Sequence, residues 1–135
     1  MNRIMGTVGI VLVLLLMGVG CRGKHEPPHF RKAKADLVKP RMAVIENALN
    51  EFKRDCGRLP DEAEGGLDAL LTSPPALEGR WKGPYCKKSQ FVDPWGNPYV
   101  YVREGQVNSG SFDLISYGAD GQEGGEGENA DVVND

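Results

Sequence analysis

The chain has 135 residues, a length that allows one domain. Its 16 Lys and Arg residues are outnumbered by 19 Asp and Glu residues, which gives a formal net charge of −3 at pH 7. Because nucleic-acid-binding domains carry an excess of positive charge, this balance argues against a nucleic-acid partner.

Residues 1–20 differ in composition from the rest of the chain. Arg3 is their only charged residue, and residues 4–19 are almost wholly apolar. A helix needs ~20 apolar residues to cross a bilayer, so this shorter run favours a cleaved export signal over an uncleaved anchor. We therefore expect residues 1–20 to be a signal peptide or a membrane anchor.

The end of the apolar run, Gly18-Val19-Gly20-Cys21, resembles a bacterial lipobox. Gly20 and Cys21 fit that pattern, whereas Gly18 stands where the lipobox prefers leucine. The resemblance implies that Cys21 becomes an acylated N-terminus, and several acyl chains hold a protein firmly on a membrane. We then expect a cell-envelope protein that faces the periplasm. Arg22 is not the aspartate that retains enteric lipoproteins at the inner membrane, so the outer membrane is favoured. The alternative is a chance cysteine after an ordinary signal peptide.

The two remaining cysteines, Cys56 and Cys86, are typical of an oxidising compartment. They form no C-x-x-C pair, and His25 and His29 lie far from both in the sequence, so we expect no zinc site. A disulfide between Cys56 and Cys86 is the natural use of an exported pair, and it would stabilise the fold by ~3–4 kcal/mol in the chain-entropy model. The alternative is two free buried thiols.

A basic segment, residues 21–35, contains two adjacent prolines and is predicted to be a tether between the membrane and the domain. An amphipathic helix is predicted at about residues 37–56, because apolar residues recur there at spacings of three and four. The residues of this stripe are Val38, Met42, Ile45, Leu49 and Phe52. Pro40 suits the first turn of the helix, and Gly57 suits its C-terminal cap. Such a helix needs a sheet on which to lie.

Further along the chain, residues 65–71 are predicted to form a short second helix, which a Ser-Pro-Pro sequence ends. The segment 93–98, Asp-Pro-Trp-Gly-Asn-Pro, is dense in turn-forming residues. Strands are predicted at residues 99–102 and 112–117, and the turn between them makes the pair an antiparallel hairpin. Together these elements predict one globular domain over residues 36–135.

Four segments of this domain resemble the globular domain of the type II secretion major pseudopilins, the protein G family. They are ALNEFKRDCGRLP from residue 48, GGLDALLTSP from residue 65, DPWGNPYVY from residue 93 and FDLISYGADGQEGGEGENAD from residue 112. The resemblance implies an α+β fold of the type IV pilin-like kind, in which an N-terminal amphipathic helix packs on a small antiparallel sheet of three or four strands and a C-terminal calcium loop follows. It also implies a structural part in protein export across the outer membrane, with other type II secretion pseudopilins as partners.

The N-terminus departs from that family. A pseudopilin leader ends in glycine, followed by Phe-Thr-Leu-x-Glu and a long apolar helix that continues into the domain helix. After Gly6 this chain has Thr-Val-Gly-Ile-Val with no glutamate, and the basic tether separates the apolar run from the domain helix. We expect a pseudopilin domain behind a lipoprotein-like signal. The alternative is a stand-alone, lipid-anchored binding module of the cell envelope with the same fold.

The C-terminal segment, residues 118–135, carries six Asp or Glu residues and no Lys or Arg. Without the resemblance, this composition favours a disordered acidic tail, and its spacing is not that of an EF-hand. With the resemblance, calcium is the expected cofactor, because it binds about six to eight oxygen atoms from carboxylates and carbonyls. The expected ligands are Asp120 and Asp131, helped by the Tyr117 carbonyl and by Glu128 or Asn129.

The sequence contains no recognisable catalytic set. Both histidines lie in the predicted tether, and no nucleophile-elbow, phosphate-loop or metal-hydrolase signature occurs. We expect no enzyme and no small-molecule substrate. Four aromatic residues are expected either to pack in the domain or to form a binding face, namely Trp81, Trp95, Tyr99 and Tyr101.

Overall fold

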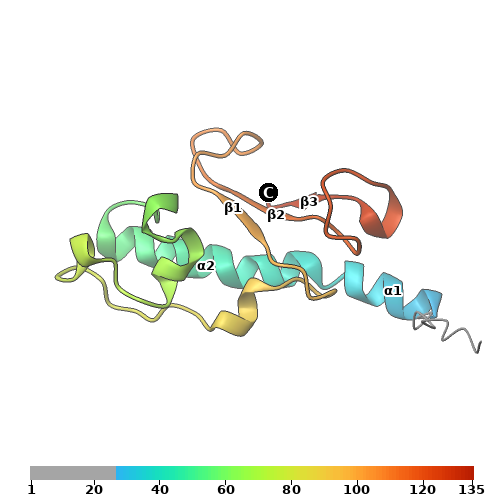
Figure 1. The fold of residues 1–135 in the computed structure, drawn as a ribbon, viewed down its shortest axis with the longest axis horizontal. Coiled ribbons are helices and arrows are strands. Elements are labelled where there is room, and N and C mark those ends of the chain that lie inside the picture. The colour runs from blue at the N-terminus through green and yellow to red at the C-terminus, as the bar shows by residue number, and fades with distance from the viewer. Residues whose placement is uncertain (1–26) are drawn as a thin grey trace, which may run out of the picture.

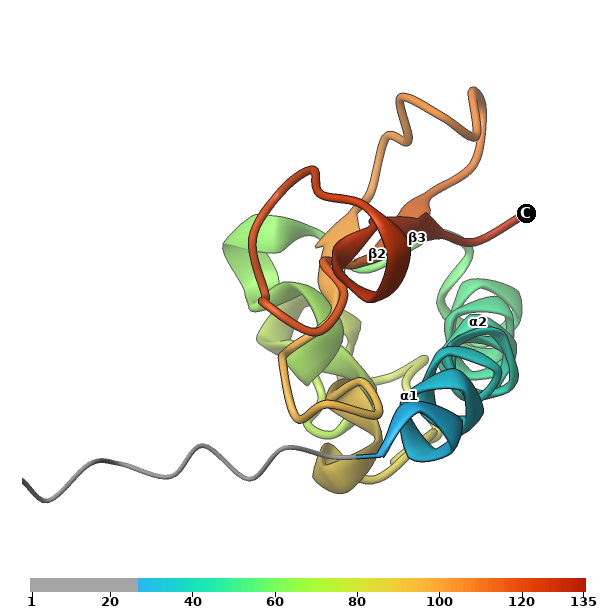
Figure 2. The same cartoon turned by 90° about the vertical axis from the view of Figure 1, so that its right-hand side faces the viewer.

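The computed structural model describes residues 27–135, so the predicted signal peptide and Cys21 lie outside the described residues (Figure 1). Two helices, α1 and α2, form one layer of the domain, and a three-stranded antiparallel sheet forms the other. The view along the helices shows the strands on one side of both (Figure 2). In the part of the chain that the structure describes, no helix is both long and apolar enough to cross a bilayer.

Helix α2, Val38–Cys56, confirms the predicted amphipathic helix. The five side chains of its apolar stripe are all 0% exposed and form the centre of the core. Burial of each such side chain stabilises the fold by about 1.5–3 kcal/mol relative to exposure. The helix ends at Gly57, whose φ of 79° is left-handed and whose N–H donates to the Lys53 carbonyl at 2.8 Å.

Helix α1, Pro28–Ala35, occupies residues that the sequence predicted to be a tether. Pro28 stands at the start of the helix, where its missing N–H costs nothing, and the lysines and alanines that follow are good helix formers. The Asp36 N–H donates to the Lys32 carbonyl at 3.0 Å, and the chain then enters α2. Helix α1 therefore continues the helical layer and projects beyond α2 at one end of the domain (Figure 1).

Residues 57–98 run from the end of α2 to the sheet through short 3-10 helices. These are η1 Glu62–Glu64, η2 Gly66–Leu70, η3 Pro75–Leu77 and η4 Lys88–Phe91. The second helix predicted at 65–71 is thus present as η2, but its geometry is 3-10 rather than α. Gly65 precedes it with a left-handed φ of 97°, and two prolines follow soon after, which leaves little more than one turn of chain.

The sheet consists of β1 Val100–Val102, β2 Asp113–Ser116 and β3 Val132–Val133, in the order β1-β2-β3. The antiparallel pairing of β1 and β2, with Val100 opposite Ile115, confirms the predicted hairpin. Val133 also pairs with Ile115, from the other side, and so adds a third strand. The residue pattern alone did not predict β3, whereas the family resemblance implied a sheet of three or four strands.

The two faces of the sheet have different surroundings. Leu114 and Ser116 point toward the helical layer and are both 0% exposed. Because side chains alternate along a strand, Ile115 lies on the opposite face, in one cross-strand row with Val100 and Val133. These three residues are only half-buried, so the helical layer covers one face of the sheet.

Candidate functional site

The acidic C-terminal segment forms an ordered loop between β2 and β3. The Ala119 N–H donates to the Glu128 carbonyl at 2.8 Å, and the Asn134 N–H donates to the Leu114 carbonyl at 3.1 Å. The first bond closes the loop on itself, and the second fixes its return to the sheet. The structure therefore shows a folded loop and not the disordered tail that composition alone favours.

Two glycines allow the halves of this loop to cross at close range. A Cβ atom on Gly118 would lie 2.6 Å from the Glu128 carbonyl oxygen, and one on Gly125 would lie 2.6 Å from the Asn129 carbonyl oxygen. Both glycines also have left-handed φ values, 64° and 93°. Only glycine fits at such positions without movement of the backbone.

The structure brings several of the predicted calcium ligands into this loop. Asp131 Oδ2 accepts a hydrogen bond from the Gly124 N–H at 2.9 Å, and Asp131 lines the same surface hollow as Tyr117. Asp120 is exposed and forms a turn of its own, since its Oδ1 accepts from the Gln122 N–H at 3.1 Å. The backbone of residues 128–129 lies against Gly118 at the start of the loop.

The donor chemistry of the loop fits calcium, because it offers carboxylate and carbonyl oxygens and contains no basic residue. However, residues 27–135 contain no group of three or more His, Cys, Asp or Glu side chains placed to hold a metal ion. A calcium ion would therefore need backbone carbonyls and water in addition to Asp120 and Asp131, a mixture that calcium accepts. The ligand set, with Tyr117, Glu128 and Asn129 as helpers, stays a prediction.

Asp93 is a buried hydrogen-bonding residue that the sequence analysis missed. Its carboxylate is almost inaccessible, and Oδ1 accepts from the N–H groups of Trp95 at 3.0 Å and Asn97 at 2.9 Å. Oδ2 accepts from the Ser116 hydroxyl at 2.7 Å, and the Asn97 side chain donates to the Gly118 carbonyl at 2.8 Å. The turn at 93–98 is thus fastened to β2 and to the start of the acidic loop. The Asp-Pro-Trp-Gly-Asn sequence could have indicated this role of Asp93, since aspartate often accepts hydrogen bonds from backbone amides that follow it in a turn.

Asp113 plays the corresponding part in the loop between β1 and β2. Its carboxylate accepts from the backbone amides of Gln106 at 2.7 Å, Val107 at 2.9 Å and Asn108 at 2.8 Å. Burial acts to raise the pKa of the Asp113 carboxyl, but the hydrogen bonds from the amides of Val107, Asn108 and Gln106 hold it below its ordinary value. An acidic residue inside a predicted strand was the signal for this role.

The two cysteines of the domain are free thiols in the structure, with Cys56 buried and Cys86 half-buried. Burial raises the pKa of both, and that of Cys86 reaches about 11. Tyr85, the neighbour of Cys86, packs edge-on against Phe52, and its hydroxyl donates to the Asp55 carboxylate at 3.0 Å. The segment that carries Cys86 is therefore fixed at the end of α2 that carries Cys56, and the disulfide stays a prediction.

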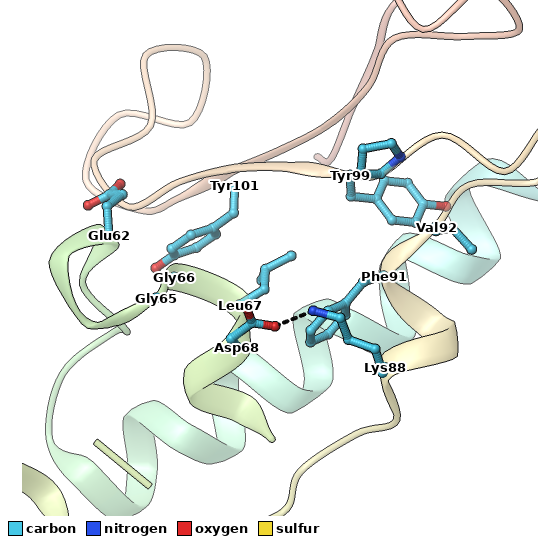
Figure 3. A pocket seen from close by; sticks show the side chains of 11 residues that line it. Glu62, Gly65, Gly66, Leu67, Asp68, Lys88, Phe91, Val92, Tyr99 and Tyr101 are labelled. Carbon is cyan, nitrogen blue, oxygen red and sulfur yellow. Dashed lines mark hydrogen bonds and ion pairs between the residues drawn. The ribbon is translucent and has the colours of Figure 1, made fainter. Parts of the chain in front are cut away.

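An apolar groove of about 560 Å³ lies between η2, η4 and β1 (Figure 3). The ion pair of Lys88 with Asp68 crosses it, and Tyr99 and Tyr101 form part of its wall. The Tyr101 hydroxyl donates to the Pro60 carbonyl at 3.0 Å, and Tyr99 is only 6% exposed. The four aromatic residues weighed as a binding face all pack in or against the core, namely Trp81, Trp95, Tyr99 and Tyr101. Packing is therefore their main role.

A long helix that carries a small antiparallel sheet, followed by a loop that returns as the last strand, defines a type IV pilin-like α+β domain. Comparisons with known proteins agree with this class. The profile of the family described as "Type II secretion system (T2SS), protein G" matches residues 28–135. The crystal structure of the major pseudopilin from the type 2 secretion system of enterohaemorrhagic Escherichia coli superposes with a TM-score of 0.61 at 27% identity, covering 78% of this chain and 90% of that one.

Two curated relatives have the same description, "Type II secretion system core protein G". The Vibrio cholerae protein is 37% identical over 134 residues, which cover 93% of this chain and 86% of that protein. The Pseudomonas aeruginosa protein is 42% identical over 106 residues, which cover 76% of this chain and 72% of that protein. The chain therefore belongs to the type II secretion system protein G family, the major pseudopilins. Its role in protein secretion is structural and non-enzymatic, it belongs to the cell envelope, and it works with other secretion components.

Proposed function

We propose that this chain is a lipid-anchored pseudopilin of the type II secretion system whose C-terminal loop is ordered by calcium. The single observation that supports the calcium part is the closed loop of residues 118–131, which gathers acidic residues without a basic one. Unneutralised carboxylates repel one another and favour an open chain. Asp135 is neutralised separately, because Lys39 of α2 contacts its carboxylate.

The residues that would hold the ion are Asp120 and Asp131, with Glu128 or Asn129 and the Tyr117 carbonyl as further oxygen donors. The ion would supply a positive centre that offsets the repulsion among these carboxylates. Ordering of the loop would in turn stabilise β3, because β3 is only two residues long and follows Asp131 directly. The chain's own part is to present oxygen atoms and to keep lysine and arginine away from them.

Calorimetric titration of the full chain in detergent micelles with calcium chloride tests this proposal. We expect binding heat and a rise in Tm, since a ligand at 100 times its Kd adds ~2.7 kcal/mol to the free energy of unfolding. Asp120→Ala should remove most of the response. Glu123→Ala should remove less, because Glu123 is exposed and is not among the expected calcium ligands. Heat and Tm that are indifferent to millimolar calcium would show that the loop is only a solvated acidic segment.

The lipid part of the proposal concerns Cys21, where the sequence resembles a lipobox. Mass spectrometry of the membrane-extracted protein should show acyl chains on Cys21 as the mature N-terminus. A domain anchored in this way would face the periplasm. Membrane fractionation should place the protein preferentially in the outer membrane, because Arg22 is not the retention aspartate. An unmodified N-terminus upstream of Cys21 would contradict the proposed lipid anchor.

A second candidate function is a stand-alone envelope module that has kept the pseudopilin fold. The observation that favours it is the N-terminal segment after Gly6, which lacks the Phe-Thr-Leu-x-Glu sequence of pseudopilin leaders. Gene deletion separates the two candidates. Loss of secreted proteins from the medium, restored by the intact gene, supports a working part of the secretion system. Unchanged secretion supports the stand-alone module.

A further inference from the structure

The face of the sheet that points away from α2 is apolar and only half-buried. Its side chains are Val100, Val102, Ile115, Tyr117 and Val133. A hollow of about 350 Å³ lies over part of this face, between the loop that joins β1 to β2 and the acidic C-terminal loop. Half-exposed β-branched and aromatic side chains in one row are typical of a surface that packs against a partner.

One wall of this hollow carries an exposed apolar side chain in a fixed position. Val107 is 66% exposed, which is the largest exposure among the large hydrophobic residues of the described chain. Its loop is held in shape because the Asp113 carboxylate accepts from three successive backbone amides, of residues 106 to 108. A contact group held in advance loses little conformational entropy when a partner binds.

The opposite wall of the hollow is acidic. Glu123 is exposed there and is not among the expected calcium ligands, and no Lys or Arg lines the hollow. An apolar floor beside an exposed carboxylate without a basic neighbour in the hollow is complementary to lysine or arginine, because these side chains combine an aliphatic stem with a cationic head. The surface therefore fits a basic segment that also carries apolar groups.

The chain itself contains a segment of this chemistry. Residues 22–34 contain one aromatic residue, Phe30, and one acidic residue, Glu26. Their five basic residues are Arg22, Lys24, Arg31, Lys32 and Lys34. Lys32 is exposed on α1, which projects from the end of the domain (Figure 1). Within one copy α1 contacts η5, Gly127–Asn129, and none of its residues lines the hollow. Helix α1 of the same copy thus leaves the hollow open to a second copy.

We propose that the outer sheet face of one copy binds the basic segment 22–34 of a second copy. The two surfaces in this contact are different, so the contact is heterologous, and each copy can offer one surface while it uses the other. Such contacts continue into rows instead of closing as a pair, which is the kind of assembly that a pseudopilin subunit needs. The inference deepens the proposed function and rests on it, because it requires copies to meet in the cell envelope.

Site-specific photocrosslinking in the full chain tests the contact. Gln106 is exposed and lines the hollow, so a benzoylphenylalanine in its place should crosslink to residues 22–34 of a second copy, as identified by mass spectrometry. Glu123→Lys should lower the yield about fivefold or more, since it places like charges together. Glu78→Lys is the matched control, because Glu78 is exposed and lies outside the hollow, and it should leave the yield unchanged. When the first copy carries Glu123→Lys, Lys32→Glu in the second copy should restore the crosslink between them.

Three outcomes would overturn the contact: a crosslink to a different protein, a crosslink to another part of the second copy, or equal yields for wild type and Glu123→Lys. The same sample is assayed for acylation of Cys21 and for the response of Tm to calcium. A protein that is acylated and calcium-responsive but fails to crosslink contradicts this inference alone. A protein that crosslinks as expected without calcium response contradicts the calcium proposal and leaves the contact standing.

Discussion

Replacement of Asp113 by asparagine should strongly destabilise the domain, although the change alters only one side-chain atom. The wild-type carboxylate accepts from the amides of Gln106, Val107 and Asn108 at 2.7 to 2.9 Å and is 2% exposed. Asparagine offers one acceptor oxygen and one NH₂ group. The NH₂ group would face backbone N–H donors, which cannot accept from it.

The size of the effect follows from these bonds. Hydrogen bonds to a charged group are worth about 1.5–3 kcal/mol each, against about 0.5–1.5 kcal/mol for neutral ones, and a buried donor left unpaired adds a further cost. We therefore expect Asp113→Asn to lower the free energy of unfolding by about 2–4 kcal/mol. For a domain of about 100 residues this corresponds to a fall in Tm of about 10–20 °C.

The pH dependence gives an independent test of the same reasoning. The pKa of the Asp113 carboxyl is lower in the folded state than its ordinary value of 3.8, so the ionised form stabilises the fold. This contribution is complete above the unfolded-state pKa and is lost as the pH falls through the lower folded-state pKa. The stability difference between wild type and Asp113→Asn should therefore be constant near neutral pH and shrink below about pH 4.

Urea unfolding of both proteins, followed by circular dichroism from pH 7 to pH 3, measures these two effects. Glu104→Gln is the matched control, because Glu104 lies exposed in the same loop and undergoes the same chemical change. It should change the free energy of unfolding by less than about 0.5 kcal/mol. If Asp113→Asn is as stable as Glu104→Gln, or if its deficit is the same at pH 3, then the buried carboxylate does not hold this loop.

Three further predictions concern the loop, the turn and the thiols. Gly125→Ala should abolish most of the calcium response and lower Tm, because the new Cβ would meet the Asn129 carbonyl. Gly124→Ala is the control, since Gly124 has a similar φ of 90° but open space around its Cβ, and it should lower Tm less. Equal effects of the two substitutions would contradict the close-packing argument. Ser116→Ala should destabilise the domain by about 1–3 kcal/mol in thermal unfolding, because Asp93 loses its buried hydroxyl donor; an unchanged Tm would show that this bond contributes nothing. Cys56→Ser should lower Tm and free one reactive thiol if the exported protein forms the predicted disulfide, whereas equal thiol counts in native and reduced wild type would refute the pairing.

The sequence predicted those parts of the fold whose signal is local and periodic. The stripe from Val38 to Phe52 repeats at helical spacing, and the helix it predicted is α2. The alternating residues of 99–102 and 112–117 predicted the hairpin of β1 and β2. The glycines and carboxylates of residues 118–131 favoured a disordered tail by composition alone, and only the family resemblance indicated a loop there.

Only the tertiary structure decided how distant segments are joined. β3 has two residues, too few for any period, and it is a strand only because Ile115 lies beside it. Asp93 and Asp113 are charged residues that a composition argument assigns to the surface, yet each is buried because backbone amides of an adjoining turn or loop converge on it. Periodicity reports which face of an element is apolar, whereas hydrogen bonds between segments depend on how the chain returns, and that return is fixed by packing of the whole domain.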